Sequence, residues 1–267
     1  MKIRPGIELA NLTDVGCERP ENEDNYCYAE PENDDDALKR GRLVVVADGM
    51  GGQEGGQVAS KLAVDSLRDV FLTGPAEDPA SVLEDAFHSA HAAIQEYART
   101  HPELAGMGTT CTAAILQDDR VTYGQVGDSR LYLIREGSIV QLTRDQSYVQ
   151  QMIDSKLITP EQAKTHPSRN ILTSALGSES TVEVDFAEAP IPLQPDDLLL
   201  LCTDGLHGTV SDEEMLAAAS QSPPREACRK LVELAKARGG LDNITIQIVR
   251  IEGTPAKSIR DTAVVGS

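Results

Sequence analysis

Several aspartates adjoin apolar runs that are typical of buried strands. Asp48, Asp128 and Asp204 follow the runs LVVVA, YGQVG and LLLLCT. Asp24 and Asp242 precede strand-like segments. One aspartate at such a junction is typical of an Asx turn or a cap. Five of them would repel one another if the strand ends converge, because two carboxylates about 4 Å apart cost on the order of 4 kcal/mol at an effective dielectric of about 20. Protonation or bound cations would relieve this repulsion.

The glycine-rich loop after Asp48 indicates that a phosphate and a divalent cation could bind there. Loops of this kind bring backbone N–H groups close to phosphate. This one is no P-loop, because no lysine follows until Lys61. The dinucleotide fingerprint fails at Glu54, the sixth position counted from Gly49 as the first. Oxygen ligands without a His or Cys cluster favour Mg²⁺ or Mn²⁺ over zinc. A divalent metal between them would let Asp48 lie beside a phosphate, with the Gly49 carbonyl as a further ligand.

Composition excludes several classes of partner. The chain has 267 residues with 24 Lys and Arg against 43 Asp and Glu, a net charge of −19, so nucleic acid and anionic membranes are poor partners. No signal peptide is recognisable, and the apolar runs are too short to span a bilayer. The five cysteines are scattered without metal-type pairs. They indicate a reducing compartment, so we expect a cytoplasmic protein.

Hydrophobic periodicity predicts the elements that must position these acids. The strand-like runs are 6–12, 25–30, 42–47, 110–117, 120–126, 130–134, 138–142, 181–187, 197–203 and 244–251. The helical stripes are 57–72, 79–99, 211–220 and 224–238. Hairpin-like strands with helices gathered in pairs predict an antiparallel α+β layered domain. Residues 32–40 read as an exposed turn, 145–176 as a polar insertion over the sheet edge, and 253–267 as a loose tail.

Eight short motifs carry a family resemblance. They are RPENEDN, ADGMGG, GTTCTAAIL, VGDSRLYL, DQS, LTSALG, CTDGL and DNIT. Their order and spacing over about residues 5 to 250 resemble the metal-dependent (type 2C) serine/threonine protein phosphatases, in a compact bacterial form. The resemblance implies an α+β fold, a four-layer α-β-β-α sandwich of two antiparallel sheets flanked by helix pairs. It also implies one catalytic domain over 1–252, with 145–176 as a flap.

The resemblance implies a set of metal ligands for two tightly bound ions, Mg²⁺ or Mn²⁺. Asp48 would bridge both ions, and the Gly49 carbonyl would bind the first. Asp204 and Asp242 would hold the second, and Asp24 would act on the first through water. A hydroxide between the two ions would then attack phosphorus directly, because two metals lower the pKa of a shared water to near neutral pH.

Three further residues complete the implied site. Asp128 would help Asp204 hold a third, weaker ion. Arg19 would bind the substrate phosphate and neutralise charge on its oxygens, and Glu23 would order waters. The implied partners are phosphoprotein substrates of a serine/threonine kinase, and we expect a monomer.

The chain departs from the family pattern at several positions. Gln53 and Gln146 stand where histidine is usual, and Ser174 stands where arginine is usual. None removes a metal ligand, so they bear on substrate preference. Met50 replaces the histidine that eukaryotic relatives place after the Asp-Gly pair. Of the five histidines only His207 closely follows a metal motif, and we expect it to face solvent, which leaves metal-bound water as the acid for the leaving group.

Two other function classes remain open. A catalytically weak relative could bind phosphoprotein or metal as a regulatory module, and loss of a bridging aspartate would favour it. An acidic calcium-binding protein would need an EF-hand spacing of aspartates, which the sequence lacks.

Overall fold

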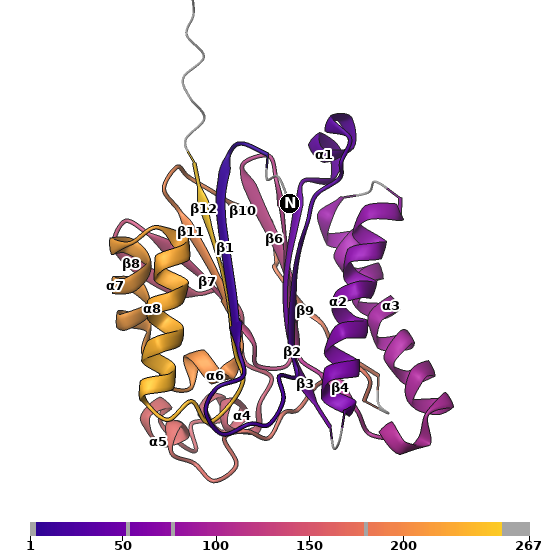
Figure 1. Cartoon of the computed structure of the whole chain (residues 1–267), viewed down its shortest axis with the longest axis vertical. Helices are drawn as coiled ribbons and strands as arrows, with labels where there is room; N and C mark the ends of the chain where they lie inside the picture. Colours follow the sequence, from indigo (N-terminus) through magenta and orange to yellow (C-terminus); the bar gives the residue numbers. More distant parts are fainter. Residues whose placement is uncertain (1–3, 52–53, 76–77, 179–180, 253–267) are drawn as a thin grey trace, which may run out of the picture.

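The protein is a four-layer sandwich in the computed structural model, which describes residues 4–51, 54–75, 78–178 and 181–252. Two antiparallel sheets face each other, and a pair of helices covers the outer side of each (Figure 1). The predicted four-layer α+β fold is therefore confirmed. The predicted tail, 253–267, and Gln53 lie outside the described residues.

One sheet contains the first and the last strand of the described chain. Its order is β1 (Ile7–Asp14), β12 (Ile244–Ile251), β11 (Leu198–Cys202), β7 (Arg130–Arg135) and β8 (Ser138–Gln141). All four neighbouring pairs are antiparallel. The outer face of this sheet packs against α7 (Asp212–Gln221) and α8 (Pro224–Ala237).

The other sheet carries the glycine-rich loop. Its order is β10 (Ile191–Pro192), β6 (Arg120–Val126), β5 (Cys111–Gln117), β3 (Arg42–Met50) and β2 (Asp24–Ala29). Two short strands lie off this path: β4 (Gly108–Thr109) pairs with β3, and β9 (Asp185–Phe186) pairs with β6. The strand predicted over 181–187 is thus only two residues long in its ladder. The outer face of this second sheet packs against α2 (Gly55–Thr73) and α3 (Pro79–Thr100).

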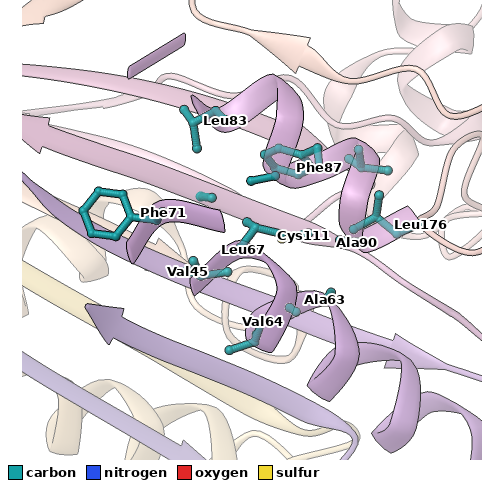
Figure 2. Packing of buried hydrophobic residues seen from close by; sticks show 14 of the residues in the cluster. Val45, Ala63, Val64, Leu67, Phe71, Leu83, Phe87, Ala90, Cys111 and Leu176 are labelled. Carbon is teal, nitrogen blue, oxygen red and sulfur yellow. The ribbon is translucent and has the colours of Figure 1, made fainter. Parts of the chain in front are cut away.

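Hydrophobic burial holds the layers together. Figure 2 shows Val45 of β3 with Leu67 and Phe71 of α2 and Phe87 of α3, all at most 1% exposed. Burying a side chain of this size stabilises a fold by about 1.5–3 kcal/mol. A separate apolar cluster fills the space between the two sheets. The sheets are therefore fixed to each other as well as to their helices. Among the described helices none is both long and apolar enough to cross a membrane.

Residues 32–40, predicted as an exposed turn, contain the helix α1 (Asp34–Arg40). Asn33 caps it, since its side chain accepts hydrogen bonds from the backbone of Asp35 and Asp36. Three aspartates in the first turn and Lys39 and Arg40 in the last complement the helix dipole. The turn prediction was wrong because these local charges, rather than an apolar stripe, define the helix.

The remaining helices are short. They are η1 (Pro102–Leu104), α4 (Tyr148–Asp154), α5 (Pro160–Lys164) and α6 (Asp204–His207). Both α4 and α5 belong to the segment 145–176, which we call the flap. Isolated bridges join Ser147 to Leu172 within the flap and Thr109 to Leu176 at its end.

Candidate metal and phosphate site

The predicted acids gather at one end of the sandwich, beside strand ends of both sheets. Asp24 begins β2 and lies directly opposite Asp48 of β3 in the ladder. Asp128 follows β6, Asp204 begins α6 and Asp242 precedes β12. The start of β2, the end of β3 and α6 lie toward the lower end of the sandwich in Figure 1. Acids that are up to 218 positions apart in the sequence, 24 to 242, thus reach one region.

Asp24 is the most buried acid of this cluster, with 5% of its surface exposed. Burial and the charges of Asp204 and Asp242 raise its pKa to about 7. Thr203 donates to its Oδ2 at 2.8 Å and opposes this rise only in part. The buried carboxyl therefore lacks a compensating positive charge.

The pKa values of three neighbouring acids are raised as well. Burial, followed by the charge of Asp242, raises the pKa of Asp204 to about 6. Burial and nearby carboxylates also raise the pKa values of Asp48 and Asp128 well above their ordinary range. The mutual repulsion expected from the sequence is present, and a bound cation would relieve it.

Two buried carboxylate oxygens also indicate that a cation would stabilise this cluster. Asp24 Oδ1 and Asp204 Oδ1 have no hydrogen-bond partner within the described structure. An unpartnered buried carboxylate oxygen is costly, and oxygen-only donors fit Mg²⁺ or Mn²⁺. However, no three His, Cys, Asp or Glu side chains in the described ranges are arranged so that they could hold a metal ion. The donor chemistry fits a hard cation, and completing its ligand set requires a carboxylate to move.

Asp242, a predicted metal ligand, is bound to another side chain. Its Oδ2 accepts a 2.7 Å hydrogen bond from Nη2 of Arg19, the predicted phosphate ligand. Hydrogen bonding to Asp242 raises the pKa of Arg19. The Arg19 side chain is 48% exposed, so it can reach a ligand from solvent.

Asn243 fixes the loop that carries Arg19. Its Oδ1 accepts from the Glu23 backbone at 2.8 Å, and its Nδ2 donates to the carbonyls of Val15 and Glu21 at 3.0 and 2.9 Å. Asn243 belongs to the DNIT motif, and no role was predicted for it. Its buried amide, 4% exposed, makes it a positioning residue for this loop. An amide immediately after a predicted ligand was the available signal.

Gly49 lies where no side chain fits. A Cβ atom there would be 2.1 Å from the carbonyl oxygen of Gly56 and 2.6 Å from that of Glu23. The Gly49 N–H donates to the Glu23 carbonyl at 3.2 Å. Burial raises the pKa of the Glu23 carboxyl. That carboxylate lies against Gly56, in the first turn of α2.

The flap is tied to the segment that carries Asp128. The Gly127 N–H donates to Oε1 of Gln146 at 2.8 Å, and the Gln146 N–H donates to the Gly127 carbonyl at 2.9 Å. The Gln146 Nε2 also donates to the backbone carbonyl of Glu183. The Ser174 hydroxyl donates to that carbonyl too, at 3.4 Å. Gln146 and Ser174, two departures from the family pattern, therefore both bind the backbone around the flap.

His207 does not face solvent, so that prediction was wrong. Its ring is partly buried, and its Nε2 lies 3.0 Å from the carbonyl oxygen of Asp128. Burial, aided by the charge of Arg130, lowers the pKa of His207 to about 3, so the ring is neutral. The single helical turn of α6 directs it inward, and four residues are too few to show a helical period in the sequence.

Comparison with known proteins identifies the family of this arrangement. Residues 28–238 match the family model described as protein phosphatase 2C. The serine/threonine protein phosphatase PstP of Mycobacterium tuberculosis is 38% identical over 220 residues, which cover 82% of this chain and 42% of PstP. This chain thus spans less than half the length of PstP. The serine/threonine phosphatase stp of Listeria welshimeri is 38% identical over 242 residues, 89% of this chain and 93% of that protein.

A solved structure supports the same assignment. The catalytic domain of PstP in complex with two manganese ions superposes with a TM-score of 0.80 at 33% identity. The match covers 93% of this chain and 99% of that domain. Family and fold agree with the resemblance read from the sequence, and the relatives have the enzyme class that it implied.

Proposed function

Because the chain belongs to the protein phosphatase 2C family, we propose that it hydrolyses phosphoserine and phosphothreonine in proteins with the help of divalent metal ions. One observation carries this proposal. Asp24, Asp48 and Asp204, at the family's motif positions, lie together with raised pKa values, and within the described structure Asp24 and Asp204 each have a buried oxygen without a hydrogen-bond partner. A cluster of this kind is stable when cations bind to it.

The predicted site residues would then bind the metal ions. Bound Mg²⁺ or Mn²⁺ would supply an activated water near neutral pH. Asp48, Asp204 and Asp242 would hold the two tight ions, the Gly49 carbonyl would add a ligand, and Asp24 would act through water. Asp128 would help to hold a third, weaker ion.

The substrate phosphate would bind at the exposed guanidinium of Arg19. A guanidinium can make two parallel hydrogen bonds to phosphate oxygens and neutralise their charge. Glu23 would order waters beside it. Its raised pKa, caused first by burial, agrees with a carboxyl that lies partly out of bulk solvent.

The biological setting is also a proposal. Phosphoproteins made by a serine/threonine kinase are the expected substrates. The five cysteines are free, which agrees with the reducing cytoplasm that we propose as the compartment.

Metal removal and one substitution test the activity. Turnover of a phosphothreonine peptide and of an aryl phosphate should fall to background in excess chelator and return with Mn²⁺ or Mg²⁺. Asp48→Asn should reduce turnover at least about 10²-fold, because one ligand of both tight ions is weakened. Asp119→Asn, at an 81% exposed side chain, is the control and should turn over normally.

Two outcomes would contradict the proposal. Full turnover in excess chelator would exclude metal-dependent hydrolysis. Tight phosphopeptide binding without turnover at any metal concentration would instead identify a regulatory binding module.

A further inference from the structure

The turn that carries Asp128 is held by hydrogen bonds to its two neighbours, Gly127 and Ser129. Gly127 adopts a φ of 93°, and a Cβ there would lie 2.6 Å from the Thr110 side chain. Gln146 binds both backbone groups of Gly127. Ser129 Oγ lies 2.7 Å from Thr110 Oγ1. These contacts hold Gly127 and Ser129 on either side of Asp128, and the hydrogen bond to the carbonyl of Asp128 itself comes from His207.

The geometry of that contact is unambiguous. A carbonyl oxygen only accepts, so the His207 Nε2, 3.0 Å from it, carries the proton and donates. The charged side chains of Arg130 and Asp145, which act on this ring, are bound to each other by hydrogen bonds of 2.9 and 2.7 Å.

His207 connects the segments that carry two of the acids. Asp128 lies between β6 of one sheet and β7 of the other, whereas Asp204 follows β11, the neighbour of β7, and begins α6. His207 ends the same short helix, so its hydrogen bond connects the two segments directly. The β7–β11 pairing of Arg130 with Cys202 also joins these segments, two residues from each acid. The His207 contact adds a hydrogen bond to Asp128 itself.

We propose that His207 is a positioning residue for the weaker metal site: by holding the Asp128 carbonyl, it fixes the Asp128 carboxylate relative to Asp204 and so sets the affinity of the third ion. This inference rests on the proposed function, because it uses the predicted ligand roles of both aspartates. It assigns His207 no contact with substrate and no proton transfer. The residue acts through Asp128.

Mn²⁺ binding tests this role without relying on turnover. Free Mn²⁺, counted by its electron paramagnetic resonance signal, should report two tight sites and one weak site in the wild-type chain. His207→Leu should leave the two tight sites unchanged and weaken the third by about three- to tenfold, the range expected for one lost hydrogen bond. His207→Gln keeps a side-chain N–H that can reach the carbonyl, and should restore the third site at least in part.

Two further variants separate positioning from a general loss of structure. His91→Leu is the matched control, because His91 also uses one ring nitrogen, which accepts from the Gly177 N–H at 3.1 Å. It should bind all three ions as the wild type does. In an Asp128→Ala background, His207→Leu should cause no additional change in Mn²⁺ binding, since the residue through which it acts is already absent.

Each outcome decides one question. Unchanged Mn²⁺ binding in folded His207→Leu, or equal loss in His207→Gln, would overturn the positioning role. Wild-type protein that binds no Mn²⁺ would instead refute the proposed function. With saturating Mn²⁺, His207→Leu should turn over phosphoserine peptide within about tenfold of wild type, whereas deleting a general acid costs about 10²–10⁴-fold. A large loss on phosphoserine but not on an aryl phosphate would make His207 the acid and overturn the inference.

Discussion

Arg19 and Asp242 are bound to each other, with 2.7 Å between Nη2 and Oδ2, although their predicted ligands are a phosphate and a metal ion. The pair is partly exposed, with 48% and 28% of the two side chains accessible. Exposed ion pairs of this kind contribute about 0–1 kcal/mol. Separating the two side chains is therefore inexpensive, so each can exchange its present partner for a ligand.

Arg19→Ala should raise KM for a phosphopeptide by more than it lowers kcat. The guanidinium would meet the phosphate in both the ground state and the transition state, and loss of such uniform binding appears mainly in KM. Steady-state kinetics at saturating Mn²⁺ would measure both constants.

Arg99→Ala provides the comparison for Arg19→Ala. Arg99 is 71% exposed and pairs with Glu96 on the outer helix α3, so its loss should alter neither constant. An unchanged KM in Arg19→Ala would show that Arg19 is only a surface ion pair.

Sequence patterns predicted the layers and the acids because both depend on short-range signals. Apolar runs mark strands, and an aspartate beside such a run can be read directly. Long-range contacts leave no such signal. The Arg19–Asp242 pair joins residues 223 positions apart, and the His207–Asp128 contact joins residues 79 apart. For Asn243 the amide after a predicted ligand was a signal, but its partners, more than 200 positions earlier, could not be read from the sequence.

Asp128→Ala should separate substrate binding from turnover. The proposed ligands of the two tight ions remain, so the variant should still bind two Mn²⁺ ions and phosphopeptide but turn over slowly. Calorimetric titration would count the ions and measure peptide affinity, and turnover would be followed at limiting and saturating Mn²⁺. Wild-type turnover at limiting metal would argue that a third ion has no role in this protein.

The flap should determine which phosphopeptides are preferred. Ser174→Arg replaces a side chain that hydrogen-bonds the Glu183 carbonyl with the residue usual in the family. It should change the ranking of a phosphopeptide panel while leaving aryl phosphate turnover within about twofold, since loops on rigid scaffolds commonly carry specificity.

A matched change elsewhere tests the flap prediction. Ser138→Arg, at an exposed serine that begins β8, should leave the ranking unchanged. An equal fall of peptide and aryl phosphate turnover in Ser174→Arg would assign the flap a structural role instead.

The stability of the protein should depend on the pair between Arg130 and Asp145, the first residue of the flap. The two side chains are 22% and 12% exposed. Burial alone would raise the pKa of Asp145, but the charge and hydrogen bonds of Arg130 outweigh it and hold that pKa below its ordinary value. A lowered folded-state pKa stabilises the fold above the unfolded-state pKa of about 3.9, and this contribution is lost as the pH falls below that value.

Asp145→Asn should therefore lower the free energy of unfolding at pH 7 by up to about 3–5 kcal/mol, because it leaves Arg130 without its charged partner. The difference from wild type should stay constant between about pH 8 and 5 and shrink below about pH 4, where the wild-type carboxylate also becomes protonated. Urea unfolding at a series of pH values would measure it. Asp119→Asn, which removes the partner of a surface pair 3.9 Å from Arg120, should cost less than about 0.5 kcal/mol. A difference in Asp145→Asn that stays constant down to the lowest pH at which both proteins fold would show that Asp145 contributes through packing rather than through its charge.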